Sequence, residues 1–232
     1  MKVFLLAAGY GTRLKPLTDT VPKCMVPICG KPLLAWWMEL FEKHNITEVL
    51  VNTHYLPCAV REFIKIYNAK NTGVRLIEAY EKELLGSGGT ILANKSFVEG
   101  ESDFLVCYAD NLTNANLTEL IAFHRRNQST LTMGLFYTNK PKECGIAAID
   151  SQSLIYEFIE KPESPKSNLA NAGIYVTGQE IFKYLPNQKF IDFGKDVLPK
   201  LINKMYGYEI KDYLLDIGNL DNYEKAQKEW QL

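Results

Sequence analysis

Apolar residues along this chain recur in two alternating patterns, one typical of strands and the other of helices. Short apolar runs bounded by polar residues predict buried strands over residues 3–8, 48–52, 74–77, 103–110, 130–137, 146–149, 154–159, 173–176 and 213–216. Apolar positions at helical spacing predict helices over residues 32–41, 59–67, 117–127, 193–203 and 221–231. This alternation is typical of an α/β fold, in which helices cover a mostly parallel sheet.

The first predicted strand leads into a short loop that contains two glycines and ends in a cation. Gly9 and Gly11 allow the backbone to approach a ligand closely, and successive amides in such a loop form an anion-binding concavity. Arg13 presents a planar fork of donors and Lys23 a compact point charge, so together they can neutralise several phosphate oxygens. The glycine spacing matches neither the dinucleotide-binding pattern nor the P-loop pattern. The loop is nevertheless a candidate site for a nucleoside triphosphate.

Two of the predicted strands end in a carboxylate. Asp110 closes the run 103–110 and Asp216 closes the run 213–216. Ligands of open α/β sheets bind at the carboxyl ends of the strands, and a carboxylate that leaves a buried strand needs a partner. Two such groups beside a triphosphate suit Mg²⁺, which prefers oxygen ligands. Taken alone, each aspartate is explained equally well as a strand-end cap or a surface turn.

Composition narrows the class of protein. The chain has 232 residues, of which 47% are hydrophobic, so we expect one domain over residues 1–232. A formal net charge of −1 provides no basic field for nucleic acid, and no apolar run is long enough to predict a membrane span. The five cysteines are scattered and odd in number, which indicates free thiols in a reducing compartment and predicts a cytoplasmic protein.

The glycine loop and the residues after it resemble the signature of the sugar-1-phosphate nucleotidyltransferases, also called sugar-nucleotide pyrophosphorylases. Eleven positions match that signature: Gly9, Gly11, Thr12, Arg13, Leu14, Pro16, Leu17, Thr18, Pro22, Lys23 and Pro27. The resemblance extends from residue 5 to about residue 224 and lacks the C-terminal β-helix domain that many relatives carry. It implies a Rossmann-like, mostly parallel mixed sheet flanked by helices, of the nucleotide-diphospho-sugar transferase type.

The resemblance also implies roles for individual residues. Those implied to bind the nucleotide are Leu6, Ala7, Ala8, Gly9, Gly11, Thr12, Arg13, Gly86, Gly88 and Asp110, with residues 85–89 resembling a nucleobase loop. Asp110 and Asp216 match the family's metal-binding aspartates and are implied to hold Mg²⁺, although Ala109 replaces the usual glycine before the first. The residues implied to bind the sugar phosphate are Gly145, Glu160, Lys161 and Asn171. A Glu-Lys-Pro sequence alone is ordinary on a protein surface, so the resemblance carries this last assignment.

The implied reaction joins a nucleoside triphosphate to a sugar 1-phosphate and releases pyrophosphate. Because the sugar phosphate is already an anionic nucleophile, the reaction needs positioning and charge neutralisation more than a general base. Arg13 and the loop amides are implied to hold the departing β- and γ-phosphates, and Lys23 to bridge the attacking and α-phosphates. Arg13 and Lys23 are therefore the catalytic candidates.

The base and the sugar follow from a narrower resemblance, to short guanylyltransferases that act on mannose or manno-heptose 1-phosphate. Guanine offers an N1–H and an exocyclic amine, a donor pair that suits a carboxylate. Glu81 is the nucleotide-binding candidate for this role, Glu83 could supply the same group, and both are explained equally well as solvated loop charges. Backbone groups alone could also read the base.

Three alternatives stay open. The first is uridylyl or thymidylyl transfer to a hexose, hexosamine or muramic-type 1-phosphate, because short relatives of that kind share most of these motifs. The second is a cytidylyltransferase acting on a non-sugar phosphate, which would not need a hexose clamp built from Glu160, Lys161 and Asn171. The third is a catalytically inactive regulatory relative. A homodimer is also left open.

Overall fold

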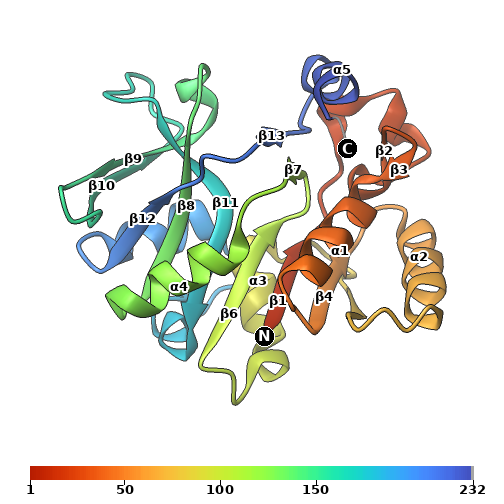
Figure 1. The fold of residues 1–232 in the computed structure, drawn as a ribbon, viewed down its shortest axis with the longest axis horizontal. Coiled ribbons are helices and arrows are strands. Elements are labelled where there is room, and N and C mark those ends of the chain that lie inside the picture. Colours follow the sequence, from red (N-terminus) through yellow and green to blue (C-terminus); the bar gives the residue numbers. More distant parts are fainter. Residues whose placement is uncertain (231–232) are drawn as a thin grey trace. The chain divides into compact units, whose positions relative to one another are not determined.

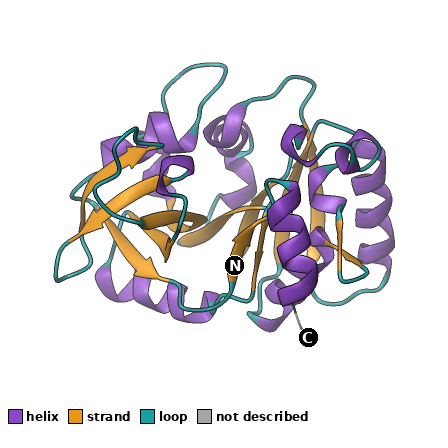
Figure 2. Ribbon diagram, turned by 90° about the horizontal axis from the view of Figure 1, so that it is seen from above, coloured by secondary structure: helices purple, strands orange, loops and turns teal. Residues whose placement is uncertain are grey.

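The computed structural model describes residues 1–230. The chain forms two compact units: unit 1 contains residues 1–84, 107–114 and the segment from residue 212 onwards, and unit 2 contains residues 85–106 and 115–211. The chain therefore passes from one unit to the other four times. Both units contain helices and strands, and Figure 2 shows the two kinds of element packed together, which confirms the α/β class. The single domain over residues 1–232 stays a prediction.

Unit 1 contains a parallel sheet with helices packed on it. Its strands are β1 (Lys2–Leu6), β4 (Glu48–Thr53) and β5 (Arg75–Tyr80), and its long helices are α1 (Leu33–Lys43) and α2 (Pro57–Ala69). β4 pairs in parallel with β1 (Figure 1) and with β5, and α2 packs against β5. Val3, Phe4 and Leu5 are consecutive and all fully buried, as expected for a strand whose two faces are both covered. The continuous apolar runs predicted these strands correctly.

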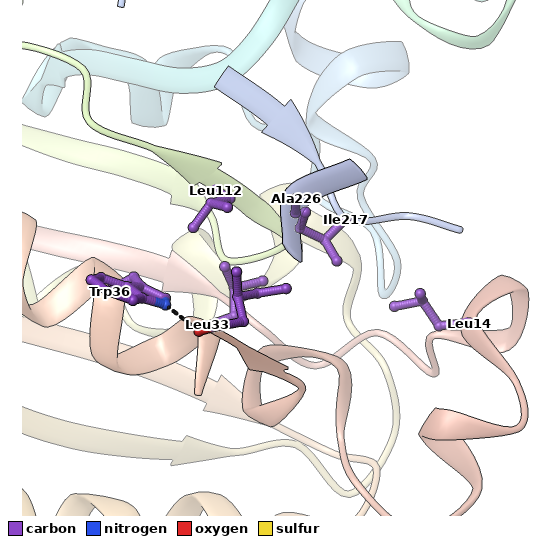
Figure 3. Close-up of a cluster of buried hydrophobic side chains, with 7 residues drawn as sticks. Leu14, Leu33, Trp36, Leu112, Ile217 and Ala226 are labelled. Carbon is purple, nitrogen blue, oxygen red and sulfur yellow. Dashed lines mark hydrogen bonds between the residues drawn. The ribbon is translucent and has the colours of Figure 1, made fainter. Parts of the chain in front are cut away.

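The rest of unit 1 is built from short elements that come from distant parts of the sequence. They are the hairpin β2 (Pro27–Ile28) and β3 (Lys31–Pro32), the pair β7 (Asn111–Thr113) and β13 (Leu214–Asp216), and the helix α5 (Leu220–Glu229). Strands β7 and β13 are antiparallel, with Asn111 opposite Asp216. The buried cluster that joins these elements contains Leu14, Ile28, Leu33, Trp36, Leu112, Ile217 and Ala226 (Figure 3). Two of its members adjoin predicted site residues in the sequence, Leu14 next to Arg13 and Ile217 next to Asp216.

Unit 2 has a mixed sheet. Its elements are α3 (Gly86–Ala93), α4 (Leu117–Asn127), β8 (Leu131–Tyr137), β9 (Gly145–Ile149), β10 (Ile155–Glu160), β11 (Leu169–Gly178) and β12 (Met205–Glu209). β11 pairs antiparallel with β8 and β9, β9 pairs antiparallel with β10, and β12 pairs in parallel with β8. The strand β6 (Asp103–Tyr108) begins in unit 2 and has its last two residues in unit 1. Parallel and antiparallel pairs together confirm the expected mixed sheet.

Several elements differ from the sequence prediction. The helix expected over residues 193–203 is a π-helical turn, Phe193–Val197, followed by a 3₁₀ turn, Leu198–Leu201. Pro199 lacks the N–H that a continuous α-helix would need there, so the apolar spacing was right and the hydrogen-bond pattern was not. Residues 86–89, expected in a loop, are the first turn of α3. Strand β12 was not predicted, and residue 231 of the last predicted helix lies outside the described residues.

None of the helices within residues 1–230 is both long enough and apolar enough to cross a membrane.

Candidate active site

The glycine loop of unit 1 is fixed at Gly11 by packing and by a side-chain hydrogen bond. Gly11 has a left-handed backbone, φ 65°, and a Cβ there would lie 2.9 Å from Cγ2 of Thr18. The hydroxyl of Thr18 donates to the carbonyl of Gly11 at 2.8 Å. The following turn, Thr12–Leu14, is anchored by the fully buried side chain of Leu14, while Arg13 is exposed. Glycine is therefore required at position 11 for both conformation and space.

Lys23 brings the two strand-end aspartates together. Its Nζ lies 2.7 Å from Oδ2 of Asp110 and 3.5 Å from Oδ1 of Asp216, and its side chain is 12% exposed. Burial acts to lower the pKa of Lys23, but the combined attraction of the two carboxylates outweighs burial and raises it. The amide of Ile217 donates to the carbonyl of Asp110 at 2.8 Å, which holds the two segments side by side. The structure thus places three predicted residues in direct contact.

A small cavity opens beside this contact. It is lined by Leu6, Ala7, Gly9, Lys23, Cys24, Ala109 and Asp110. Four of the predicted nucleotide-binding residues, including Asp110, line it together with the catalytic candidate Lys23. The amide of Ala7 already donates to Oδ1 of Asn52 at 2.6 Å, so that amide is engaged within the protein. The end of β1 and the strand-end aspartate therefore share one concave surface in unit 1.

Asp216 has the features of a cation ligand. Its Oδ1 is buried and lies 3.5 Å from Nζ of Lys23, which is too far for a strong hydrogen bond. Burial raises the pKa of Asp216, and repulsion from Asp110 raises it further, against the attraction of Lys23 and Arg13. Two neighbouring carboxylates, one of which has a buried and weakly paired oxygen, fit Mg²⁺, which takes one or two protein carboxylates and completes its shell with water and substrate phosphates. Among residues 1–230 there is no cluster of three or more His, Cys, Asp and Glu side chains suited to a metal, so phosphate and water oxygens would have to supply the other ligands.

Gly218 allows Asp216 and Arg13 to approach each other. A Cβ at Gly218 would lie 2.7 Å and 2.9 Å from the two carboxylate oxygens of Asp216, and 3.1 Å from Nη2 of Arg13. Both charged groups therefore pack closely against the backbone at position 218.

In unit 2, two of the four predicted sugar-phosphate residues face each other across neighbouring strands. Gly145 on β9 is opposite Glu160 on β10, and a Cβ at position 145 would lie 2.5 Å from Oε2 of Glu160. Burial raises the pKa of Glu160, the nearby Asp192 raises it further, and Lys161 opposes both. Lys161 follows with a left-handed backbone, φ 48°, and its amide donates to the carbonyl of Cys144 at 3.1 Å.

Asn171 on β11 is engaged by its own strand. Its Nδ2 donates to the hydroxyl of Tyr175 at 2.6 Å, and its Oδ1 accepts from the amide of Gly173 at 2.9 Å. The neighbouring Ala170 pairs with Ile146 of β9, one residue beyond Gly145. Asn171 is therefore placed near the Gly145 end of β9, and its role toward a sugar stays a prediction.

The sequence analysis did not identify residues 192–196, a segment outside the strands that lies close to Glu160. A Cβ at Gly194 would lie 3.0 Å from Oε2 of Glu160 and 3.3 Å from Oδ1 of Asp192. The signal was present as two aspartates and a lysine close around a glycine over residues 192–196, but the helical spacing of the apolar residues hid it.

Ile191, which directly precedes that segment, explains the glycines at the start of α3. Gly86 has a left-handed backbone, φ 77°, and a Cβ there would collide with the carbonyl oxygen of Ile191. A Cβ at Gly88 would lie 2.6 Å from Cγ2 of Ile191, and the amide of Gly88 donates to the Ile191 carbonyl at 2.8 Å. Close packing within unit 2 thus requires both glycines, and their contact with a nucleotide stays a prediction.

Glu81 is nearly buried at the end of β5. It is 4% exposed, and its Oε1 accepts a hydrogen bond from Nδ2 of Asn52 at 2.8 Å. Asn52, also 4% exposed, was not identified from the sequence. The only signal for it was a polar residue near the end of the apolar run 48–52. Glu83 is exposed. Of the two glutamates proposed to read the base, Glu81 is therefore the one whose side chain is buried and held by a hydrogen bond.

An α/β chain with a glycine loop, two adjacent strand-end carboxylates and a lysine between them has the parts of an enzyme that binds a nucleotide by its phosphates. The sequence profile of the Nucleotidyl transferase family matches residues 2–231, and the chain belongs to that family. This confirms the resemblance on which the site assignments were based.

Two curated relatives and one solved structure show where the chain lies within the family. It is 31% identical over 223 residues to a mannose-1-phosphate guanyltransferase of Eremothecium gossypii, covering 94% of this chain and 61% of the relative. It is 30% identical over 245 residues to a UTP–glucose-1-phosphate uridylyltransferase of Synechocystis sp., covering 97% and 62%. The chain thus spans about three fifths of the length of these relatives.

The structure of HddC from Yersinia pseudotuberculosis superimposes with a TM-score of 0.84 at 26% identity, over 99% of both chains. A second structure of HddC, complexed with GMP-PN, gives a TM-score of 0.83.

Proposed function

We propose that this chain transfers a nucleoside monophosphate from a nucleoside triphosphate to a sugar 1-phosphate, with GTP and mannose or manno-heptose 1-phosphate as its substrates. The observation that carries the reaction is the contact of Lys23 with Asp110 and Asp216 beside the glycine loop. The guanyltransferase name of the Eremothecium gossypii relative and the GMP-PN in the HddC structure support guanine.

The proposed chemistry follows from the charges in unit 1. Arg13 and the loop amides hold the two phosphates that leave as pyrophosphate. Lys23 moves from the carboxylates to the phosphates, where it neutralises the charge that repels the attacking sugar phosphate. Asp110 and Asp216 would hold Mg²⁺, which when bound supplies positive charge to the phosphate oxygens. Positioning and charge neutralisation of this kind account for most catalysis of phosphoryl-type transfer. The proposed reaction therefore requires no general base.

The proposed sugar site lies in unit 2. Glu160 accepts hydrogen bonds from sugar hydroxyls, Lys161 pairs with the sugar phosphate, and Asn171 presents its side chain to the ring. The missing Cβ at Gly145 leaves room for the carboxylate of Glu160 beside β9. Because Glu160 is confined by glycines at positions 145 and 194, a larger residue at either position would displace it.

Steady-state measurement of pyrophosphate release tests the proposal. GTP, UTP, dTTP and CTP are each paired with mannose, manno-heptose, glucose and hexosamine 1-phosphates, and kcat/KM is compared. Lys23→Ala, assayed alongside, assigns the activity to this site. We expect the highest kcat/KM for GTP with a manno-configured sugar. Release of no pyrophosphate with any pair would contradict the reaction, and a preference for UTP or dTTP would contradict only the choice of base.

Uridylyl transfer is the second candidate, because the chain is nearly as similar to the Synechocystis uridylyltransferase as to the guanyltransferase. The sugar-site residues in unit 2 weigh against a cytidylyltransferase for non-sugar phosphates. An inactive regulatory relative is disfavoured because Lys23, Asp110 and Asp216 are present and in contact. Cytoplasmic location and a homodimer stay predictions.

A further inference from the structure

Asn52 connects the glycine loop to Glu81 with both ends of its amide. Its Oδ1 accepts from the amide of Ala7 at 2.6 Å, and its Nδ2 donates to Oε1 of Glu81 at 2.8 Å. The opposite orientation would set an amide NH₂ against the N–H of Ala7 and an oxygen against a carboxylate. The partners therefore fix the orientation of the Asn52 amide, and the amide in turn fixes the orientation of the Glu81 carboxylate.

A second connection links the same two segments. Nδ1 of His54 lies 2.9 Å from the carbonyl oxygen of Glu81, and its Nε2 lies 3.0 Å from the hydroxyl of Tyr10. Since a carbonyl can only accept, Nδ1 carries the proton and Nε2 accepts from Tyr10. Ala7 is thus joined through Asn52 to the side chain of Glu81, and Tyr10 is joined through His54 to the backbone of Glu81.

We propose that Asn52 is a positioning residue that determines which nucleobase the protein accepts, by holding the Glu81 carboxylate toward the base. This inference rests on the proposed function, in which Glu81 accepts the N1–H and amine of guanine. Asn52 itself contacts no substrate in the proposal. Its role is to keep an acceptor in one place and one orientation.

The discrimination follows from burial and from hydrogen-bond chemistry. Asn52 and Glu81 are each 4% exposed, so little water is available to satisfy a mismatched group there. Guanine brings two donors to the carboxylate, whereas uracil presents a carbonyl on either side of its single N–H. A buried polar group left without its partner rejects the wrong substrate strongly. A carboxylate that is free to rotate away would lose this discrimination.

Three variants test the proposal through the ratio of kcat/KM for GTP to that for UTP. Asn52→Asp places a second carboxylate against Glu81. The double variant Asn52→Asp with Glu81→Gln reverses the polarity of the pair and restores a hydrogen bond between them. Thr53→Val is the matched control, because the Thr53 hydroxyl donates to Oε1 of Glu78 at 2.6 Å between the same two strands but points to the other face of the sheet.

We expect Asn52→Asp to lower kcat/KM for GTP by roughly 10- to 100-fold, the range for an unsatisfied buried polar group, and to change that for UTP by less than about threefold. The double variant should recover the thermal midpoint lost in Asn52→Asp but not the GTP/UTP ratio, because an amide now stands at position 81. Thr53→Val should leave the ratio unchanged.

Three outcomes separate the inference from the proposed function. Equal losses with GTP and UTP in Asn52→Asp would show a purely structural role and overturn the inference. Recovery of the GTP/UTP ratio in the double variant would overturn it too, since Glu81 would not then be reading the base. A wild-type protein that prefers UTP would instead refute the guanine assignment itself.

Discussion

Replacement of Gly218 by alanine tests whether the position of Asp216 matters for catalysis. The new Cβ would lie 2.7 Å from one oxygen of Asp216, about 0.7 Å closer than the 3.4 Å at which ordinary contact begins. Nη2 of Arg13, at 3.1 Å, is also too close. The carboxylate or the backbone must shift by several tenths of an ångström. A misplacement of about 1 Å in an active site can cost about 10²-fold in rate, so we expect kcat to fall on the order of 10- to 100-fold.

The assay is single-turnover pyrophosphate release at saturating nucleotide, with the thermal midpoint measured in parallel. Gly178→Ala is the matched control, because its Cβ would lie 2.6 Å from the backbone oxygen of Ser102, a comparable clash away from the proposed site residues. We expect that control to lower the thermal midpoint and keep kcat. A Gly218→Ala protein that turns over within about threefold of wild type would refute the reasoning, since tenfold corresponds to about 1.4 kcal/mol.

Three further predictions concern charge. Arg13→Ala and Lys23→Ala should each lower the single-turnover rate by roughly 10²–10³-fold, as for loss of one preorganised electrostatic contact. Lys23→Arg should not restore the rate, because a planar fork replaces a point charge. A loss under about threefold would show the residue to be peripheral. Asp110→Asn and Asp216→Asn should abolish most turnover and keep the fold by circular dichroism, and normal rates at limiting Mg²⁺ would rule out the altered residue as a ligand. Burial lowers the pKa of His124 below its ordinary value of 6.5. Below about pH 6.5, His124 therefore binds a proton in the unfolded chain while it stays neutral in the folded chain, and stability falls as the pH drops toward the folded pKa. His124→Gln should flatten this part of a plot of urea midpoint against pH, and equal slopes in both proteins would contradict the assignment.

The phosphate end of the site could be predicted from the sequence because strand ends are visible there. An apolar run that stops at a glycine loop or an aspartate marks both the strand and the edge where ligands bind. Asp110 and Asp216 were found in this way, and Lys23, identified from the loop and the family signature, lies in contact with both. The pairing of β7 with β13, which brings the two aspartates together, had no local signal and was not predicted; the resemblance to a known family implied only that both aspartates bind the same metal.

Asn52 and Gly194 could not be predicted because their importance lies in contacts across the fold. Asn52 is one polar residue in an apolar strand, and its partners are 45 and 29 residues away in the sequence. Gly194 lies in a segment whose buried residues, such as Phe193 and Val197, keep helical spacing while the backbone forms a π-helical turn. Spacing reports which side chains are buried, but it does not report which carbonyl each amide reaches.

The buried cluster that contains Leu14 has a consequence for how the protein is made. Leu14, next to Arg13, shares that cluster with Ile217 and Ala226, so the segment up to α5 must leave the ribosome before the loop has its full support. Contacts between such distant residues form late in folding, and the early strands must wait for them. A nascent chain arrested before α5 should therefore bind nucleotide weakly, and the glycine loop, although translated long before α5, should become functional only after it.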